Sequence, residues 1–262
     1  MRNKIICVVQ ARVNSSRLPG KILLSIYNKS LLRHLLERLK KLKEIDDLFV
    51  ATTKNKEDDL VSKIAKDTKV KIYRGDENNV LKRFYNCSKI NSSNVIIRIT
   101  ADCPLIDIKY VAELLYFFKN SNFDYVSNVG TNYLPDGFHC EIFNFKSLAK
   151  TYRLAKSTFD KEHVTSFIWS NPKLFSIYSY KGKKLENYSK KVRLTIDYPE
   201  DYILIKKVFK KLYKKNKFFS LEEILAFLKK NNSLLQINRK YHNLQWNKYH
   251  SKREKYKKIQ QS

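Results

Sequence analysis

The chain has 262 residues, of which 43% are hydrophobic, and it carries a formal net charge of +28. This hydrophobic content is enough for a packed core in one large α/β domain. No apolar run reaches the roughly 18 residues of a membrane span, and the first ten residues do not have the pattern of a signal peptide, so we expect a cytoplasmic protein.

The cysteines and the basic charge narrow the function classes further. Cys7, Cys87, Cys103 and Cys140 have no C-x-x-C spacing, which argues against a zinc site and a disulfide framework. The positive charge is mostly lysine spread over the chain, and residues 252–258 are the only dense cluster. No zinc-finger, RNP or basic-heptad pattern accompanies it, so we expect no specific nucleic-acid partner. A basic nucleic-acid-binding protein remains an alternative.

The first half of the chain alternates short apolar runs with amphipathic segments. The apolar runs are typical of buried strands, and the segments with apolar residues at helical spacing predict helices. This alternation predicts parallel βαβ units. The expected strands span residues 5–9, 48–52, 70–73 and 94–100, and the expected helices span residues 30–43, 57–67 and 80–90.

The second half is less regular, and its last part is polar, aromatic and basic. We interpret residues 1–240 as one domain and residues 241–262 as a basic C-terminal tail. The expected elements are helices over 108–119, 160–169, 200–215 and 221–230, a helix capped by Ser147, strands over 123–127, 174–180 and 192–196, and an extended stretch over 137–145.

A polar loop follows the first predicted strand. Its cations are Arg12, Arg17 and Lys21, and Ser15 and Ser16 add hydroxyl groups. In open α/β sheets, ligands bind at the carboxyl ends of strands, and three cations with several donors suit a polyphosphate. The loop does not have the P-loop pattern. A surface loop in a protein rich in basic residues is the alternative.

Two aspartates each follow a predicted strand and precede a proline. Asp102 follows the strand over 94–100, and Asp197 follows the strand over 192–196. Mg²⁺ prefers carboxylate oxygens together with phosphates and water, so two carboxylates at strand ends could share one cation. The alternative is that each aspartate caps the helix that follows it.

Several motifs resemble one family. Residues 10–21, Gln-Ala-Arg-Val-Asn-Ser-Ser-Arg-Leu-Pro-Gly-Lys, resemble the first motif of the SpsF-type cytidylyltransferases, which are relatives of the CMP-sialate and CMP-KDO synthetases. Residues 98–107 resemble the second motif, and residues 196–201 resemble the Ile-Asp-x-Pro-Glu-Asp motif of the KDO-type relatives. Residues 135–141 and 161–165 are similar to two further motifs. The resemblance covers roughly residues 4–210.

The resemblance implies a Rossmann-like, GT-A-type nucleotidyltransferase fold, with a mostly parallel mixed sheet flanked by helices. The implied activity is transfer of CMP from CTP to a sugar-like or phosphorylated acceptor in surface polysaccharide or glycoconjugate synthesis, with release of pyrophosphate. A homodimer is also expected. The implied site comprises catalytic Arg12, Lys21, Asp102 and Asp197; nucleotide-binding Ala11, Arg12, Ser15, Ser16, Arg17, Lys21, Arg74, Asp76 and Arg98; acceptor-binding Asp136, His139, Glu141 and His163; and Mg²⁺ on Asp102 and Asp197.

The acceptor and the reaction class leave alternatives open. His139 stands where the family commonly has a carboxylate, so the sequence does not identify the acceptor. A GT-A glycosyltransferase that uses a finished nucleotide sugar is the second function class. Against it, no D-x-D triplet follows a strand, and the basic loop suits a triphosphate better than a diphosphate.

Overall fold

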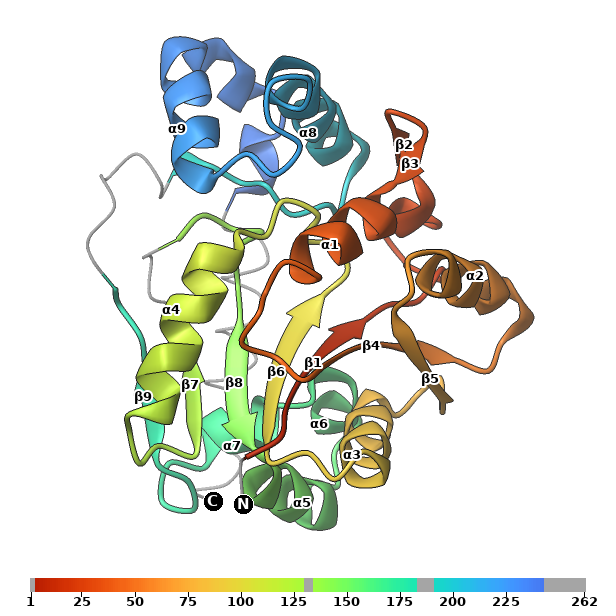
Figure 1. The fold of residues 1–262 in the computed structure, drawn as a ribbon, viewed down its shortest axis with the longest axis vertical. Coiled ribbons are helices and arrows are strands. Elements are labelled where there is room, and N and C mark those ends of the chain that lie inside the picture. Colours follow the sequence, from red (N-terminus) through yellow and green to blue (C-terminus); the bar gives the residue numbers. More distant parts are fainter. Residues whose placement is uncertain (1–2, 130–133, 183–190, 243–262) are drawn as a thin grey trace.

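A computed structural model describes residues 3–129, 134–182 and 191–242 (Figure 1). A seven-stranded sheet with the order β5-β4-β1-β6-β8-β7-β9 lies at its centre. Strands β5, β4, β1 and β6 are parallel, β8 is antiparallel to β6 and β7, and β9 is parallel to β7. The predicted mostly parallel mixed sheet is therefore confirmed. The strands are β1 (Ile5–Gln10), β4 (Asp47–Thr53), β5 (Lys71–Gly75), β6 (Val95–Thr100), β7 (Tyr125–Ser127), β8 (Glu141–Asn144) and β9 (Ile177–Ser179).

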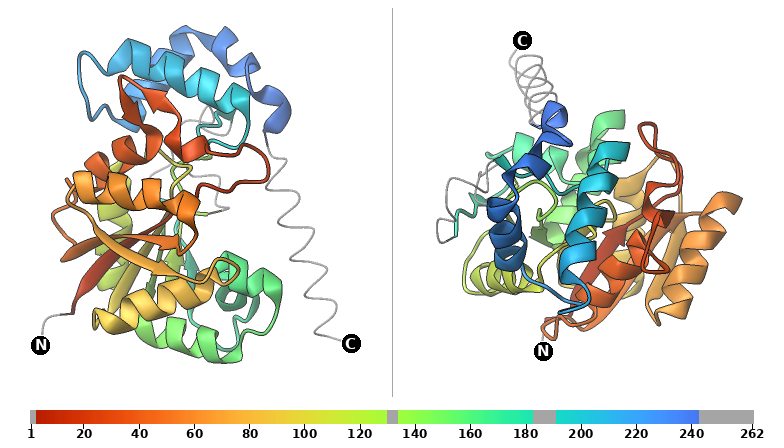
Figure 2. Two further views of the ribbon diagram at one scale, coloured as in Figure 1. Left: turned by 90° about the vertical axis from the view of Figure 1, so that its right-hand side faces the viewer. Right: turned by 90° about the horizontal axis from the view of Figure 1, so that it is seen from above.

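Helices cover both faces of this sheet (Figures 1 and 2). Successive side chains of a strand point to opposite faces, so each central strand supplies two cores. Cys7 and Val9 of β1 pack with α1, α2 and α4, whereas Ile6 and Val8 pack with α3, α5 and α7. The helices are α1 (Leu31–Leu39), α2 (Asp59–Asp67), α3 (Val80–Ile90), α4 (Ile108–Lys119), α5 (Phe145–Leu154), α6 (Thr158–His163), α7 (Ser166–Ser170), α8 (Pro199–Leu212) and α9 (Leu221–Lys230).

A third hydrophobic cluster lies beyond the carboxyl end of β6. Helices α8 and α9 lie at the top of Figure 1. The cluster joins them to the apolar side chains of residues 192–196 and to Leu31 and Leu105. The short hairpin of β2 (Ser25–Ile26) and β3 (Lys29–Ser30) contacts α8. The carboxyl edge of the sheet is therefore covered by a small helical layer, and the candidate site lies beneath that layer.

Several helices begin and end where the sequence pattern predicts. The predicted helices over 80–90, 108–119 and 221–230 are confirmed. Ser30 caps α1 by accepting a hydrogen bond from the Arg33 N–H at 3.2 Å, but α1 ends at Leu39, before the predicted end. The Ser147 cap is wrong, because Asn144 caps α5 and accepts from the Ser147 N–H at 2.8 Å.

The predicted helix over 160–169 is confirmed in part, because the segment is helical but divided into α6 and α7. Val164 lies between them at φ 58°, in the left-handed region, so the helix does not continue through it.

The predicted strand over 192–196 is also wrong. The segment is buried, but its hydrogen bonds go to two loops: Leu194 N–H donates to Asp136 O at 2.7 Å, and Ile196 N–H donates to Asp102 O at 2.9 Å. A short apolar run indicates burial, but its periodicity alone does not distinguish a strand from another buried segment.

Within the described ranges, no helix is both long and apolar enough to cross a membrane. The predicted basic tail lies outside the described residues from residue 243 onward. The division into residues 1–240 and 241–262 therefore stays a prediction.

Candidate functional site

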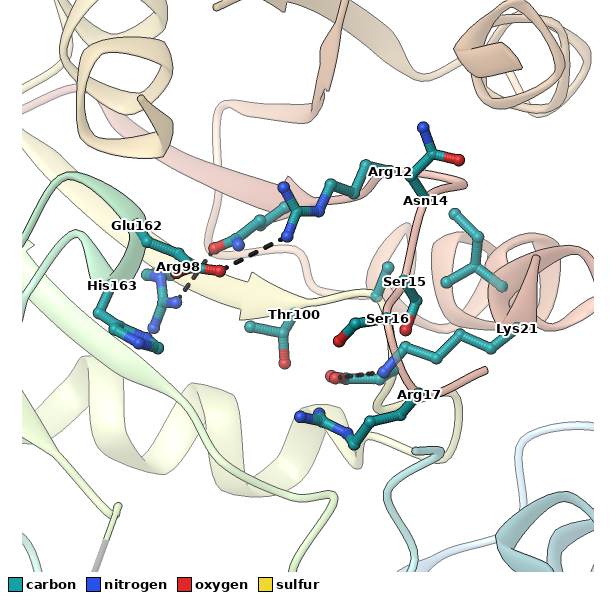
Figure 3. Close-up of a pocket in the computed structure, with 14 residues that line it drawn as sticks. Arg12, Asn14, Ser15, Ser16, Arg17, Lys21, Arg98, Thr100, Glu162 and His163 are labelled. Atoms are coloured by element: carbon teal, nitrogen blue, oxygen red, sulfur yellow. Dashed lines mark hydrogen bonds and ion pairs between the residues drawn. The ribbon is translucent and has the colours of Figure 1, made fainter. Parts of the chain in front are cut away.

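A cavity of about 280 Å³ opens at the carboxyl ends of β1 and β6 (Figure 3). These strands are parallel neighbours, so the segments that follow them meet at one edge of the sheet. Three parts of the chain form the wall: the loop after β1, the end of β6, and the end of α6. The lining residues are Gln10, Arg12, Asn14, Ser15, Ser16, Arg17, Lys21, Ile22, Arg98, Thr100, Ala101, Asp102, Glu162 and His163.

The loop after β1 is held at both ends by hydrogen bonds. Val13 N–H donates to the Asp58 carboxylate at 2.7 Å, and Thr53 holds that carboxylate from the other side. Gly20 N–H donates to Val13 O at 3.0 Å and closes the loop. Gly20 has φ 70°, a conformation that glycine adopts without a steric penalty. The closed loop leads directly into Lys21.

Lys21 lies between the two predicted metal ligands. Its Nζ donates to Asp102 Oδ2 at 3.0 Å, to Asp197 Oδ1 at 2.9 Å and to Ile196 O at 2.6 Å. The Lys21 side chain is 10% exposed. Burial acts to lower the pKa of Lys21, but attraction to Asp102 and Asp197 outweighs it and raises the pKa above its ordinary value. Lys21 is therefore an ammonium ion at neutral pH.

Both aspartates are charged for the same reason. Burial acts to raise the pKa of Asp102 and of Asp197, but the Lys21 ammonium ion reverses this effect, and the pKa of each lies below its ordinary value. Asp197 Oδ1 also accepts from Arg17 at 2.5 Å. Neither aspartate is a helix cap, because Asp107 caps α4 and Asp201 closes the first turn of α8. The capping alternative is wrong for both residues.

Arg193 is a site residue that the sequence analysis missed. It is 1% exposed, and its guanidinium donates to Asp136, Asp197 and Asp201 at 2.8 to 3.2 Å. Burial acts to lower the pKa of Arg193, but its bonds and attraction to these aspartates raise it. The available signal was an arginine inside an otherwise apolar run, since such a residue needs buried anionic partners.

The opposite wall of the cavity is built around Arg98. Arg98 lines the cavity, donates to Gln10 Oε1 at 3.0 Å and forms an ion pair with Glu141. Glu141 is buried and also accepts from Tyr125 Oη at 2.6 Å and Thr165 Oγ1 at 2.5 Å. Burial acts to raise the pKa of Glu141, but Arg98 and the two hydroxyl groups lower it. In the structure, Glu141 holds Arg98 from behind the cavity wall.

Two further contacts define the mouth of the cavity. Arg12 reaches from the loop toward α6 and pairs with Glu162 at 3.5 Å (Figure 3). Both side chains are substantially exposed, so this pair contributes little to stability. His163 lines the cavity beside Glu162, and its ring packs on Phe159 with centroids 4.3 Å apart.

Other predicted residues lie outside the described lining. Arg74 donates to Thr53 O and Asn55 O, both at 2.8 Å, and pairs with Asp59. Asp76 accepts from the Asn78 N–H at 2.9 Å. The roles of Arg74 and Asp76 in nucleotide binding stay predictions.

The two predicted acceptor residues of the 135–139 loop lie together. His139 Nδ1 is 3.5 Å from Asp136 Oδ1, and both side chains are partly exposed beside Arg193.

Ala11, which was predicted to bind the nucleotide, is buried and donates its N–H to Ala51 O at 3.2 Å. Within the described lining, the residues that the prediction left out are Gln10, Asn14, Ile22, Thr100, Ala101 and Glu162.

The carboxylates of Asp102 and Asp197 fit a metal ion that takes its other ligands from a substrate and water. In the part of the chain that the structure describes, no three His, Cys, Asp or Glu side chains form a group able to hold a metal ion. Asp102 and Asp197 contact the same ammonium ion, so their oxygens converge on one space. Mg²⁺ is usually bound by one or two carboxylates plus phosphates and water. The two aspartates fit that mode and do not form an all-protein cage.

Comparisons with known proteins identify the family. A family model described as cytidylyltransferase matches residues 6–240. The chain belongs to the cytidylyltransferase family. The cytidylyltransferase motifs that the sequence resembles lie at Lys21, Asp102 and Asp197, the residues that meet at the carboxyl edge of the sheet. The family membership supports a nucleotidyltransferase class of enzyme.

Individual relatives of this cytidylyltransferase agree with the family model. An uncharacterized protein of Methanocaldococcus jannaschii is 39% identical over 239 residues, which cover 90% of this chain and 94% of that one. The spore coat polysaccharide biosynthesis protein SpsF of Bacillus subtilis is 30% identical, with coverage of 87% and 95%. A solved cytidylyltransferase structure from Leptospira borgpetersenii has a TM-score of 0.84 at 31% identity, with coverage of 90% and 98%. The fold is thus that of the nucleotidyltransferases.

Proposed function

We propose that this enzyme transfers CMP from CTP to an acceptor oxygen and releases pyrophosphate. One observation carries the proposal: Lys21 is held between Asp102 and Asp197 beneath a loop that brings Arg12 and Arg17 into the same cavity. Membership of the cytidylyltransferase family supports CTP as the nucleotide. The predicted cytoplasmic location and the homodimer remain part of the proposal.

The triphosphate would lie along the loop after β1. Arg12, Arg17 and Lys21 can donate charge-assisted hydrogen bonds to phosphate oxygens, and Ser15 and Ser16 can donate from their hydroxyl groups. Arg12 and Arg17 have side chains that are 36% and 38% exposed. They can therefore leave their present carboxylate partners without a large change in burial. Lys21 now gives its three N–H groups to Asp102, Asp197 and Ile196 O, so a phosphate oxygen would take the place of at least one of these acceptors when CTP and Mg²⁺ bind.

In the transfer step, the acceptor oxygen forms a bond to the α-phosphorus of CTP while the bond to pyrophosphate breaks. The acceptor proton is lost to solvent or a nearby base, and the negative charge leaves with pyrophosphate. Such a reaction depends mainly on positioning and on neutralisation of charge. Mg²⁺ on Asp102 and Asp197 would supply part of that neutralisation. The cations of the loop would supply the rest.

The acceptor would approach from the side of the 135–139 loop and α6. Asp136, His139 and His163 are the side chains proposed to contact it. Glu141 would act by holding Arg98 in the cavity wall, since its carboxylate is bound by three protein donors. SpsF is named for spore coat polysaccharide biosynthesis, which supports a sugar-like or phosphorylated acceptor in surface polysaccharide or glycoconjugate synthesis.

The proposal is tested with CTP labelled at either the α- or the γ-phosphorus. The purified protein is incubated with Mg²⁺ and a panel of 2-keto acid sugars, phosphorylated polyols and phosphonates. We expect the α-label in a new product and the γ-label in pyrophosphate. Sugar transfer from a nucleotide sugar, without consumption of CTP, would support a glycosyltransferase. DNA or RNA binding that depends strongly on salt and survives loss of Arg12 and Asp102 would support a nucleic-acid-binding protein.

A further inference from the structure

Arg193 lies where three functional parts of the chain meet. Its Nη1 donates to Asp136 at 2.9 Å, its Nη2 donates to Asp197 at 2.8 Å, and its Nε donates to Asp201 at 3.0 Å. Asp136 belongs to the loop proposed to contact the acceptor, and Asp201 belongs to the first turn of α8. One guanidinium group therefore joins the acceptor loop, a proposed cation ligand and the helix behind them.

Arg193 is itself fixed from behind. Asp201 bonds both its Nε and its Nη2, and Asn238 donates to Asp201 Oδ1 at 2.8 Å and to Arg193 O at 3.1 Å. Asp201 also accepts the N–H groups of Asp197 and Tyr198. The planar guanidinium can form these bonds at the same time, which the single ammonium group of lysine cannot do. Its orientation is therefore set by residues outside the cavity.

This arrangement separates the two oxygens of Asp197. Oδ2 accepts from Arg193, whereas Oδ1 accepts from Lys21 and Arg17. Rotation of the carboxylate would break the bond to Arg193 in a buried environment, and an unpaired buried charge is costly. Arg193 thus keeps Oδ1 directed toward Lys21 and Arg17, which line the cavity.

The acceptor loop is fixed against the same residue. Asp136 and Arg193 form an isolated parallel bridge, and a Cβ atom on Gly137 would lie 2.5 Å from the Leu194 carbonyl. The two segments are therefore as close as their backbones allow. A shift of Arg193 would move the loop with Asp136 and the carboxylate of Asp197 together.

We propose that Arg193 is a positioning residue, which aims Asp197 at the cation that accompanies the nucleotide and ties that carboxylate to the acceptor loop. Residues that orient a ligand in this way typically change metal affinity by about 10- to 100-fold when they are replaced. This role rests on the binding of CTP with Mg²⁺ proposed above. It needs no contact between Arg193 and the substrate.

The test measures CTP binding by isothermal titration calorimetry over a series of Mg²⁺ concentrations. In Arg193→Lys, we expect the half-saturating Mg²⁺ concentration to rise about tenfold. Arg38→Lys is the matched control, because Arg38 of α1 is a buried arginine that donates to Phe219 O, outside the site. Arg38→Lys should lower the melting temperature and leave the Mg²⁺ requirement unchanged.

Two further variants make the test decisive. If Arg193 acts through Asp197, then Arg193→Lys should change the Mg²⁺ requirement less than about twofold when Asp197→Asn is already present. Asn238→Ala removes two bonds to the cluster and leaves every charge in place, so it stays informative if Arg193→Lys does not fold. It should raise the requirement by about threefold, a fraction of the tenfold effect expected for Arg193→Lys.

Each outcome decides a different question. If the wild-type protein binds CTP with Mg²⁺ but folded Arg193→Lys binds it with an unchanged Mg²⁺ requirement, Arg193 is only structural and the positioning role is overturned. If Arg193→Lys does not fold, an unchanged Mg²⁺ requirement in Asn238→Ala likewise overturns the positioning role. If the wild-type protein does not bind CTP at any Mg²⁺ concentration, the proposed function fails and the positioning role fails with it.

Discussion

Replacement of Lys21 by methionine tests the structure of the site apart from catalysis. Methionine keeps most of the length and volume of the side chain but removes the ammonium group. In the wild-type chain this group satisfies Asp102, Asp197 and Ile196 O within 3.0 Å, and the Lys21 side chain is 10% exposed. The variant leaves two carboxylates facing each other without the cation between them.

The expected loss follows from burial. Removal of one partner from a buried ion pair destabilises a protein by about 3–5 kcal/mol, because the remaining charge is left unpaired. Asp102 is 25% exposed and Arg17 and Arg193 still contact Asp197, so we expect the lower end, about 3 kcal/mol. Urea unfolding followed by circular dichroism measures this value.

Lys29→Met is the matched control for this measurement. Lys29 belongs to the neighbouring hairpin and pairs with Glu37 at 2.7 Å, but both side chains are about one quarter exposed. Partly exposed pairs of this kind contribute about 0–1 kcal/mol. A loss in Lys21→Met that is no greater than the loss in Lys29→Met would refute the view that Lys21 neutralises a buried pair of carboxylates.

Mg²⁺ should act differently on the two proteins. In Lys21→Met the converging carboxylates are free to bind a dication, so Mg²⁺ should recover part of the lost stability. In the wild-type protein without CTP, the ammonium group occupies that space and Mg²⁺ should add little. Equal stabilisation of both proteins by Mg²⁺ would show that the cation binds elsewhere.

Further predictions concern the aspartates, the acceptor loop, acid stability and assembly. Asp102→Asn and Asp197→Asn should each raise the Mg²⁺ needed for CTP binding in calorimetry about tenfold, and the double variant should lose much less than the product of the single losses. Gly137→Ala should lower the unfolding free energy in urea by at least about 2 kcal/mol, because its φ is 103° and its Cβ would contact the Leu194 backbone. The pKa of Asp102 and of Asp197 lies below the ordinary value of 3.8 in the folded chain. Their contribution to stability is therefore present above pH 3.8 and is lost as the pH falls below that value. Urea unfolding between about pH 5 and pH 3 should therefore show a smaller loss in Asp197→Asn. Light scattering at micromolar concentration should give the mass of a homodimer, and a monomer mass would contradict that prediction.

The sequence allowed accurate prediction where the signal is local. The helices over 80–90 and 221–230 are confirmed because a cap at the start and amphipathic spacing along the length define each of them. The convergence of Lys21 and Asp102 could also be expected, since parallel strands bring their carboxyl ends to one edge of the sheet.

The remaining errors come from contacts that are distant in the chain. Residues 192–196 have the composition of a strand, but their hydrogen-bond partners lie in loops near Asp102 and Asp136. Only the folded chain shows those partners. The role of Glu141 toward the acceptor stays a prediction, and its ion pair with Arg98, 43 residues away, could not be predicted from the sequence. The Arg193 cluster was missed because its three aspartates become neighbours only after folding.

The most direct measurement of the central claim is the comparison of CTP, ATP, GTP and UTP as stabilising ligands. Each nucleotide is added with Mg²⁺ to the wild-type protein and to Lys21→Ala, and the melting temperature is recorded. We expect CTP to stabilise the wild-type protein most, by about 2.7 kcal/mol at 100 times its Kd, and to have little effect on Lys21→Ala. Equal shifts with all four nucleotides, or a CTP shift that persists in Lys21→Ala, would contradict a CTP site at Lys21.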